Sequence, residues 1–525
     1  MNPNTESTVK GGQQANKKYT VANSLVTYYL IIMFGFFPLF LTEKYAHARL
    51  DKFWLYMILS AVLTVSVALC AFMYRSEARV KGEEYHIIKP ITLPDVMMLC
   101  FWGFAAISTA FSAHLVDALT GAVARNNGLV LLTAYMLVYF VLTRYYRSKS
   151  YVLAVYLIVS SVVALLTVLN FYYIDPLGML AGYDEATVND FGSTIGNKNI
   201  IATFMCLFLP TAMMCFVITE DKVMRIVSAA AIMFAYTGLI SADSTSDIFG
   251  LAVIVPVMMI FCARSWTHLR RYMLALTLMF ISGKLLYLLS LALGDHNKGF
   301  EFIQEFLIHS PVMYAPIVIF GLLYIAMKLL TPRMESVYKP KAVRITLGAI
   351  FAAVVIGALG VFIYFTAVDT TTDLGDYEKL LRFSDAWGTH RGFMWRVSLE
   401  EYKKFNLFQW LFGTGPDTLY YVLIPHFDVL LEEFGDAATD CAHNEYINYL
   451  ITQGALGLAA YIGFMGSVIA RGLKASKKNP FTLIFISAVI CYLAQAAVNL
   501  YNPIVTPLMF IFASLAEAVS RETLC

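Results

Sequence analysis

Charged residues are scarce in this sequence, and their scarcity excludes an ordinary soluble protein. Asp, Glu, Lys and Arg make up 14% of its 525 residues, and hydrophobic residues make up 59%. A soluble domain normally carries about 25% charged residues. Because the deficit extends along most of the chain, it indicates a protein built into a bilayer rather than a soluble domain with one anchor. The formal net charge of +2 gives no reason to expect a nucleic-acid partner.

The sequence also lacks the cysteine patterns of a disulfide framework or a metal site. It has 8 cysteines, but no CxxC motif and no Cys/His spacing that would suit a metal ion. Most of the cysteines lie inside apolar runs, where this residue behaves as a small hydrophobe. We therefore expect neither disulfides nor a bound metal. An internal repeat and a low-complexity stretch are likewise undetectable.

Long apolar runs are what the sequence has in abundance. A helix needs about 20 apolar residues to cross a bilayer, and this length divides the chain into about fourteen candidate spans. We therefore predict an all-α polytopic membrane protein. The predicted spans are 24–41, 53–74, 93–112, 127–143, 151–174, 199–219, 223–241, 246–262, 269–293, 311–331, 342–366, 444–470, 480–501 and 503–520.

The distribution of basic residues predicts how these spans are oriented. With the N-terminus inside, the even-numbered spans end in the cytoplasm, and basic residues should gather there. They do so at Arg75, Arg79, Lys81 and Lys89, at Arg144, Arg147 and Lys149, at Arg264, Arg270 and Arg271, at Arg333, Lys339, Lys341 and Arg344, and at Arg471, Lys474, Lys477 and Lys478. An even number of spans with both termini cytoplasmic follows from this alternation.

The same pattern divides the chain into five parts. Residues 1–23 form a cytoplasmic tail, which we predict to be uncleaved because no small-residue cleavage site follows the first apolar run. A bundle of about 11 helices spans 24–366, and about 3 more helices span 443–520, by the same length criterion. Between them lies one long extracytoplasmic loop, 367–442, and residues 521–525 end the chain in the cytoplasm. The long loop is where chemistry should be sought first.

Polar residues at the outer ends of two spans are candidates for binding an anion. Such groups are costly at membrane depth and are functional candidates by default, although many only join helices. Arg125 is the one Lys or Arg of its outer loop, and it either anchors a helix end at the interface or binds phosphate through its forked guanidinium. Lys198 and Asn199 stand where a Gly/Asn-rich turn opens a helix. That turn either presents N–H groups to an anion or is an ordinary helix cap.

Two further polar features lie between or inside spans. The segment Ser241-Ala-Asp243-Ser-Thr-Ser-Asp247 contains residue types that favour a tight turn, and a functional role is the alternative. Lys284 lies well inside a predicted span, so it either extends toward the interface or faces a polar cavity.

The long loop carries the strongest signal. Residues 385–405 predict a helix of about five turns, on which Arg391, Trp395, Ser398 and Tyr402 share one face. An exposed helix would not need an arginine beside tryptophans, whereas a face that binds sugar and phosphate would. This helix therefore predicts part of a binding site.

The loop then passes through a Gly-rich turn, Gly413-Thr-Gly415, which suits close approach of the backbone. It ends in His443 and Asn444, directly at the start of the next span. At a helix N-terminus the dipole and the unpaired N–H groups disfavour an imidazolium ion. We therefore expect His443 to be neutral near pH 7, able to accept a proton or to donate one hydrogen bond to phosphate. A plain helix cap is the alternative, but together with Arg391 the functional interpretation is favoured.

Taken in order, these elements resemble the O-antigen ligase and Wzy-type polymerase superfamily of bacterial glycan-assembly enzymes. The resemblance covers most of the chain and agrees in topology. It rests on Gly121…Arg125…Gly128, Asn197…Asn199…Ala202, Arg391…Trp395, Gly413-x-Gly415, His443-Asn444-Glu445, Gly454…Gly457 and Gln495…Asn499.

The resemblance implies an activity and roles for these residues. Such enzymes transfer a glycan from polyprenyl diphosphate to an acceptor hydroxyl on the outer side of the bacterial cytoplasmic membrane, without a metal, another cofactor or a nucleotide sugar. Arg391 would hold the diphosphate and stabilise it as the leaving group, and His443 would activate the hydroxyl or donate to the diphosphate. The residues that would complete binding of the diphosphate and glycan are Arg125, Lys198, Asn199, Trp395 and Asn444.

The sequence departs from the family pattern at one place. Many relatives have an arginine after a serine in the turn that here reads Asp243-Ser-Thr-Ser-Asp247, and this chain has none. Either Arg125 or Lys198 then supplies a second positive charge, or the donor is held differently.

Several functions fit this pattern. Within the superfamily the protein could be a repeat-unit polymerase, a ligase or a protein glycosylase, and the divergent turn and the number of spans favour the polymerase. A transporter or flippase of lipid-linked oligosaccharide is the alternative from another class, although no inverted repeat supports it. A membrane sensor would need a soluble output domain, which the sequence lacks.

Overall fold

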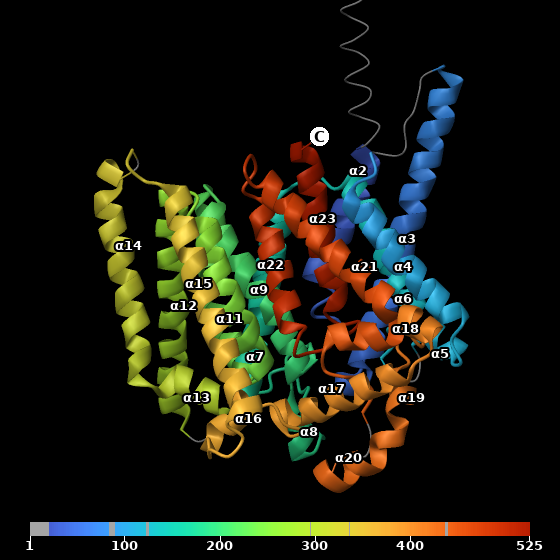
Figure 1. The fold of residues 1–525 in the computed structure, drawn as a ribbon. Coiled ribbons are helices and arrows are strands. Elements are labelled where there is room, and N and C mark those ends of the chain that lie inside the picture. Colours follow the sequence, from blue (N-terminus) through green and yellow to red (C-terminus); the bar gives the residue numbers. More distant parts are fainter. Residues whose placement is uncertain are drawn as a thin grey trace, which may run out of the picture.

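The computed structural model is a helical bundle (Figure 1). It describes residues 20–82, 90–121, 125–294, 296–334, 336–435 and 439–524, so the predicted tail lies almost wholly outside the described residues. The described chain begins and ends at the same end of the bundle. The predicted all-α class is confirmed, since the described strands form one short antiparallel pair, β1 (Phe191–Gly192) with β2 (Gly196–Asn197).

Long helices run between the two ends of the bundle, and shorter helices connect them. The long helices are α2 (Thr20–Gly35), α3 (Lys44–Val80), α4 (Leu93–Ala110), α6 (Leu129–Tyr145), α7 (Ser150–Phe171), α9 (Lys198–Ile218), α10 (Lys222–Ser241), α11 (Thr245–Cys262), α12 (Trp266–Leu293), α14 (Tyr314–Met334), α15 (Pro340–Ile363), α21 (Glu445–Ala475), α22 (Thr482–Gln495) and α23 (Thr506–Leu524). The shorter ones are α5 (Leu115–Thr120), α8 (Glu185–Asp190), α13 (Phe302–His309), α16 (Glu378–Leu381), α17 (Trp387–Lys404), α18 (Leu407–Phe412), α19 (Leu419–Leu423) and α20 (Phe427–Phe434).

Among the described residues, 10 helices are long and apolar enough to cross a membrane. They are α3, α4, α7, α9, α10, α11, α12, α14, α15 and α21, and the apolar helices α2, α6 and α22 are shorter. Each predicted span falls on one of the long helices. The membrane-protein class is therefore supported, and the larger number of spans stays a prediction.

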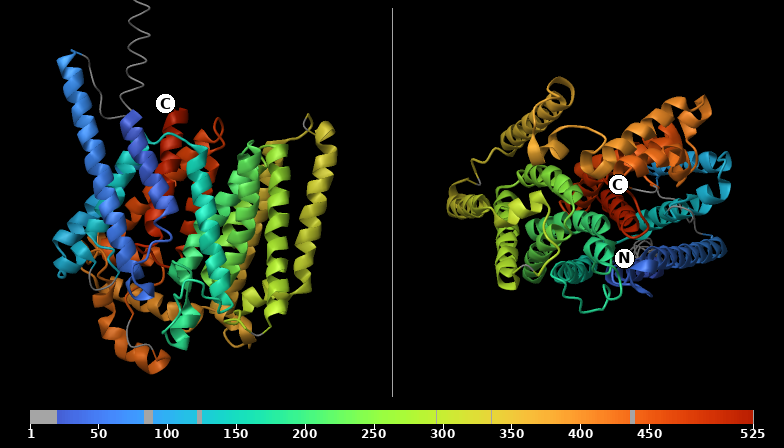
Figure 2. Two further views of the ribbon diagram at one scale, coloured as in Figure 1. Left: turned by 180° about the vertical axis from the view of Figure 1, so that it is seen from behind. Right: turned by 90° about the horizontal axis from the view of Figure 1, so that it is seen from below.

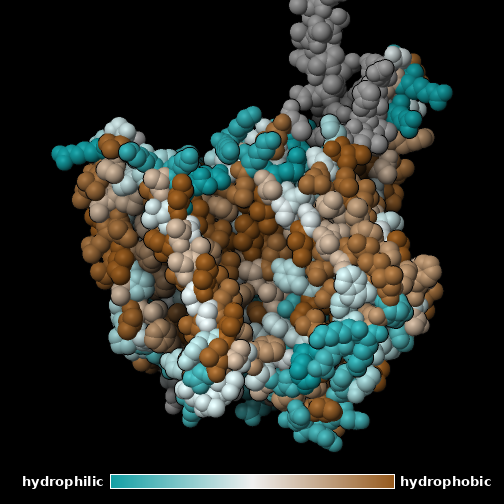
Figure 3. Space-filling model, in the orientation of Figure 1, coloured by the Kyte–Doolittle hydropathy of each residue, from teal (hydrophilic) through white to brown (hydrophobic). Residues whose placement is uncertain are grey.

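The surface of the molecule is divided into zones, as a bilayer would require. A hydrophobic belt lies between two hydrophilic ends (Figure 3). Large apolar side chains face outward from several of the long helices, and Phe72 on α3 and Ile356 on α15 are both 70% exposed. Soluble proteins rarely expose contiguous apolar surface on this scale.

Helices α16 to α20 gather at one end of the bundle, opposite the described termini, and cover one side of that end (Figures 1 and 2). They belong to the segment predicted as the long loop. The helix predicted over 385–405 is present as α17, but Gly388, Thr389 and His390 have φ of 60°, 59° and 65°. The regular helix therefore begins at Arg391.

Helix α9 is buried along almost its whole length. It is apolar on all sides, as expected of a helix enclosed by others, and it packs against α7, α10, α11, α12 and α22. Since α9 begins at Lys198, this packing holds its polar N-terminus in the middle of the bundle.

Helix α21 is broken at Gly454, where φ is 70°. The break frees carbonyl groups of the preceding turn, and the backbone N–H of Gly415 donates to the carbonyl of Thr452 at 2.9 Å. A Cβ atom on Gly413 would lie 2.3 Å from the carbonyl carbon of Thr452. The Gly-rich turn thus permits close backbone approach, but the neighbouring backbone is that of α21.

Lys284 has a structural role. Its Nζ donates to the carbonyls of Ile308 and Ser310, at 2.6 and 2.9 Å, and it lies over the ring of Tyr314. These carbonyls end α13, so Lys284 satisfies a helix C-terminus.

Candidate active site

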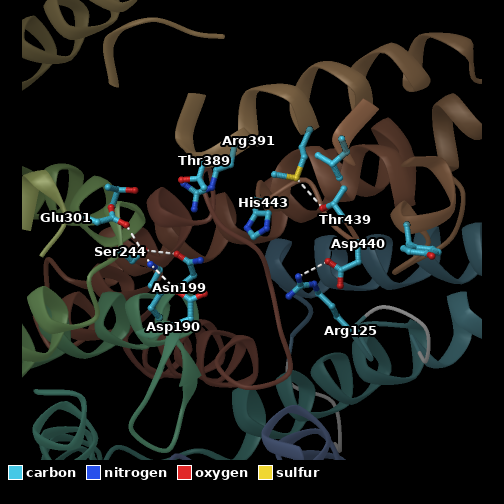
Figure 4. A pocket seen from close by; sticks show the side chains of 15 residues that line it. Arg125, Asp190, Asn199, Ser244, Glu301, Thr389, Arg391, Thr439, Asp440 and His443 are labelled. Atoms are coloured by element: carbon cyan, nitrogen blue, oxygen red, sulfur yellow. Dashed lines mark hydrogen bonds and ion pairs between the residues drawn. The ribbon is translucent and has the colours of Figure 1, made fainter. Parts of the chain in front are cut away.

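Five of the residues predicted for the site line one cavity of about 620 Å³. The cavity lies where the N-terminus of α9, the turn between α10 and α11, α17 and the segment before α21 meet. Figure 4 shows the labelled side chains around it. The five residues are Arg125, Lys198, Asn199, Arg391 and His443.

Arg391 is buried at the start of the regular part of α17 and lines the cavity. Within the described part of the chain, no hydrogen bond or ion pair holds its guanidinium. Burial lowers the pKa of Arg391, but a guanidinium stays protonated in proteins. A buried charge without a partner is costly, so this arginine suits an anion supplied from outside.

Arg125 enters the cavity from the loop between α5 and α6. Its Nη2 donates to Asp440 at 2.7 Å, while its buried Nε has no hydrogen-bond partner among the described residues. Oδ2 of Asp417 accepts the backbone N–H groups of Arg125 and Asn127, at 2.9 and 3.0 Å. Asp417 therefore fixes the loop, and one edge of the guanidinium remains for a ligand.

The carboxyl groups around Arg125 differ in their pKa. Burial raises the pKa of Asp417 to about 6. Burial also opposes ionisation of Asp440, but the charge and hydrogen bond of Arg125 hold the pKa of Asp440 below its ordinary value. At neutral pH both groups are ionised, and Asp440 offsets part of the charge of Arg125.

Lys198 is balanced by carboxylates. Its Nζ lies 3.3 Å from Asp190 and 3.8 Å from Glu301. The backbone N–H of Asn199 donates to Oδ1 of Asn197 at 3.0 Å, so the cap already occupies an N–H group that an anion could have used. An ordinary cap therefore accounts for this N–H group, and two carboxylates balance the charge of Lys198.

A polar network lies under Asn199. Its Oδ1 accepts a hydrogen bond from Ser244 at 2.8 Å, and its carbonyl accepts one from Asn499 at 2.9 Å. The side chain of Gln495 donates to Ser246 at 3.1 Å. The polar turn between α10 and α11 therefore joins α9 to the end of α22, and Ser244 forms part of the cavity wall.

His443 lies between Arg391 and Arg125 in Figure 4. Its backbone has φ of 46°, a conformation that is uncommon outside glycine and often marks a functional position. Its buried Nδ1 has no hydrogen-bond partner in the described ranges. Burial, Arg391 and Arg125 lower the pKa of His443 to about 3, against the opposing effect of Asp440. The imidazole is therefore neutral at pH 7, chiefly because of burial and the two arginines.

Trp395 and Asn444 are not among the residues that line the cavity. The indole N–H of Trp395 donates to the carbonyl of Ala442 at 2.9 Å. Oδ1 of Asn444 accepts the backbone N–H groups of Tyr446 and Ile447, both at 3.0 Å. The structure thus gives both residues backbone contacts next to His443, and their predicted role as substrate ligands stays a prediction.

A second cavity of about 280 Å³ shares Arg125, Asn199 and His443 with the first. Arg49 on α3 also lines it, and the sequence did not single out this residue. The tyrosine one turn earlier, Tyr45, donates to the carbonyl of Ser193 at 3.0 Å. This contact anchors the start of α3 on the β1–β2 hairpin.

The two cavities differ in charge. Three cationic and three acidic side chains line the larger cavity, namely Arg125, Lys198, Arg391, Asp190, Glu301 and Asp440. The described residues that line the smaller cavity include Arg49 and Arg125 and no carboxylate. Its remaining wall is largely apolar, formed by residues such as Ala48, Ile195, Ile200, Leu500 and Ile504.

This arrangement suits the chemistry of an anion that carries an apolar chain. Arg125 and Arg391 lie beside one neutral histidine. Arg49 lines the smaller of the two cavities that share this histidine, and that cavity has an apolar wall. In the parts of the chain that the structure describes, no three His, Cys, Asp or Glu side chains gather as a metal ion would require. Comparison with protein-family models and with curated proteins finds no match for this chain.

Proposed function

We propose that this protein is a membrane glycosyltransferase of the O-antigen ligase and polymerase type. It transfers a glycan from a polyprenyl (undecaprenyl) diphosphate to an acceptor hydroxyl on the outer side of a bacterial cytoplasmic membrane. The observation that carries the proposal is that Arg125 and Arg391 lie beside His443, where the larger cavity shares a wall with a smaller one that Arg49 also lines.

The smaller cavity suits the diphosphate and the first part of the carrier lipid. Arg49 and Arg125 both line it, and guanidinium groups bind phosphate through two parallel hydrogen bonds. The apolar wall formed with Ile200 and Ile504 suits a polyprenyl chain. Arg49 thus supplies the second cation that the turn at Asp243–Asp247 lacks.

The larger cavity suits sugars. Its balanced charges and its hydroxyl and amide groups, including Asn199, Ser244 and Thr389, can exchange hydrogen bonds with sugar hydroxyls. A volume of about 620 Å³ lies within the range of typical ligand sites, about 300–1,000 Å³. Donor sugar and acceptor would therefore meet beside His443.

In the proposed reaction the acceptor oxygen attacks C1 of the donor sugar. A bond forms between that oxygen and C1, and the bond between C1 and the diphosphate oxygen breaks. The electron pair leaves with the diphosphate. Arg125, which lines both cavities, and Arg391, from the larger one, stabilise its added charge where the cavities meet. His443 takes the proton of the acceptor hydroxyl.

The arginines make the basicity of His443 depend on the donor. In the free protein, burial and the two arginines hold the pKa of His443 at about 3, and such an imidazole is a weak base. A bound diphosphate offsets the positive charge and raises this pKa. The base is therefore strong only when the leaving group is in place.

We further propose about fourteen membrane spans by the length criterion, with both termini in the cytoplasm. Helices α16 to α20 then lie on the outer side, over the site. Within the superfamily we favour a repeat-unit polymerase of surface polysaccharide over a ligase, because the turn at Asp243–Asp247 departs from the ligase pattern.

Reconstitution with a lipid-linked oligosaccharide tests the proposal. Purified protein in proteoliposomes would receive the polyprenyl-diphosphate-linked repeat unit, with products separated by size. A ladder of products is expected for a polymerase, whereas a single transfer to an added acceptor would indicate a ligase. Movement of the substrate across the bilayer without a new glycosidic bond would contradict the proposal and indicate a transporter.

A further inference from the structure

A third cavity, called the basic cavity below, lies at the opposite end of the bundle from His443. It has a volume of about 490 Å³ and lies between the C-terminus of α9, the N-terminal parts of α10 and α12, and α14. Its described lining residues differ from those of the two cavities at His443. Helices α12 and α14 run side by side along one edge of the molecule (Figures 1 and 2).

The polar half of this basic cavity is strongly cationic. Its basic side chains are Lys222, Arg225, Arg270 and Arg271. The acidic side chain that pairs with them is Glu220. Its carboxylate accepts hydrogen bonds from both Nη atoms of Arg271, at 2.9 and 2.8 Å, and from Nη2 of Arg225 at 3.4 Å. Four cations against one carboxylate leave an excess of three positive charges in this group.

Two of the cations have no acidic partner among the residues that the structure describes. Arg270 donates to the hydroxyl of Thr331 at 2.9 Å. Lys222 has no ion pair or hydrogen bond within the described ranges, and the buried Nε of Arg225 likewise has no partner there. The cavity therefore has donors available for an anion.

The other half of the cavity is apolar and continues onto the outer surface of the bundle. Phe216, Leu274 and Tyr324 form part of its wall. Ile226 also lines it and is 71% exposed, and Val223, one turn of α10 away, is 69% exposed. A ligand that fits both halves has an anionic head and apolar chains.

We propose that this cavity binds the phosphate headgroup of an anionic phospholipid, with its acyl chains against α10, α12 and α14. Basic pockets between membrane helices bind such headgroups, and the field of an anionic leaflet adds to the attraction. Free phosphate shares the headgroup chemistry but does not use the apolar wall. The proposal does not depend on the reaction at His443.

Native mass spectrometry of the full chain in a neutral detergent tests this site. Cardiolipin, phosphatidylglycerol and phosphatidylcholine would be titrated into wild type and into K222Q/R270Q, which leaves the structural contacts of Arg271 intact. The matched control is K477Q/K478Q, which removes two exposed cations elsewhere in the chain. We expect the two anionic lipids to bind the wild type more tightly than phosphatidylcholine. We also expect cardiolipin to bind K222Q/R270Q at least about tenfold more weakly than the wild type, with no such loss in the control, because hydrogen bonds from charged donors to the headgroup are lost.

Equal binding of cardiolipin by wild type and K222Q/R270Q would overturn the proposal, as would equal binding of phosphatidylcholine and the anionic lipids. A parallel titration with inorganic phosphate distinguishes the two sources of phosphate. If phosphate at millimolar concentration displaces cardiolipin completely, the acyl chains contribute nothing and the lipid assignment is wrong. Unchanged elution and unfolding temperature of K222Q/R270Q before lipid is added would show that the variant is folded.

Discussion

The indole N–H of Trp395 donates to the carbonyl oxygen of Ala442 at 2.9 Å. Trp395 lies one turn after Arg391 on α17, and Ala442 directly precedes His443. The hydrogen bond therefore fixes the distance between the helix that carries the unpaired arginine and the segment that carries the histidine.

Replacing Trp395 with phenylalanine removes this hydrogen bond and keeps most of the ring. We expect kcat to fall about 5- to 10-fold, since one neutral hydrogen bond contributes about 1 kcal/mol, with a smaller change in the donor KM. Steady-state kinetics on reconstituted protein measures both values. The control is W410F, because Trp410 lies in α18 with its side chain 46% exposed. Equal rates for W395F and wild type would show that the hydrogen bond of Trp395 does not position His443.

Replacing Arg391 with lysine keeps the positive charge but removes the planar guanidinium, which can bind phosphate through two parallel hydrogen bonds. We expect transfer to fall by about 10²-fold or more, the loss that follows removal of one donor to a developing anion. The matched control is R396K, on the same helix, where Arg396 is paired with Asp385 and Glu400. If R391K retains the wild-type rate, Arg391 does not bind the leaving group.

Replacing Arg49 with glutamine should weaken donor binding. Loss of a charged hydrogen bond of about 1.5–3 kcal/mol corresponds to a rise of about 10- to 100-fold in the donor dissociation constant. Binding of a non-transferable polyprenyl diphosphate to purified protein measures it. R79Q is the control, because Arg79 lies in the last turn of the same helix. A larger effect of R79Q than of R49Q would rule out the assignment of the smaller cavity.

The pH dependence should follow Asp417 rather than His443 in the free protein. The pKa of Asp417 is about 6 and that of His443 about 3. As pH falls through 6, Asp417 gains a proton. The hydrogen bonds that it accepts from the loop of Arg125 then weaken, because a neutral carboxyl group is a weaker acceptor than a carboxylate. His443 stays neutral throughout pH 5–8.

We therefore expect the donor KM to rise about fivefold between pH 7 and pH 5, which corresponds to about 1 kcal/mol. In D417N the KM should stay at the raised value and no longer depend on pH. A wild-type KM that is constant over this interval, or a D417N variant that keeps the pH dependence, would contradict the role of Asp417.

The helices could be predicted because a long apolar run has few stable structures in a bilayer. With no water to satisfy the backbone, such a run forms a helix, and each predicted span indeed falls on a helix. The short elements α8, β1 and β2 escaped prediction, because contacts from distant segments fix them. The hydrogen bonds from Tyr45 to Ser193 and from Ser193 to Asn170 are examples.

Five residues of the larger cavity could be singled out because local pattern marks them. Arg391 follows the period of a helix face, and His443 stands at a helix start. Arg49 was missed because the first helix after the outer turn was predicted to begin at residue 53, whereas α3 begins at Lys44. The available signal was a group of basic residues on the side predicted to lie outside, where the positive-inside rule disfavours them.

Sequence alone could not distinguish residues that line the site from residues that stabilise the backbone around it. Lys52 lies close to Arg49 in the chain, yet it donates to the carbonyls of Phe37, Pro38 and Phe40, each at 3.0 Å. It therefore satisfies the end of α2. Trp395 was predicted as a ligand from its place on the helix face of Arg391. Its distance from the cavity depends on how α17 meets the segment before α21, and the sequence does not give this arrangement.

The most direct test of the central claim is the release of polyprenyl diphosphate from a lipid-linked repeat unit by purified protein, measured together with new glycosidic bonds. We predict one polyprenyl diphosphate per bond for the wild type. H443A should release it at least about 10²-fold more slowly, while retaining wild-type unfolding temperature and donor binding within about tenfold. A folded H443A variant with the wild-type rate, or a wild type that forms no bond and releases no polyprenyl diphosphate, would contradict the account.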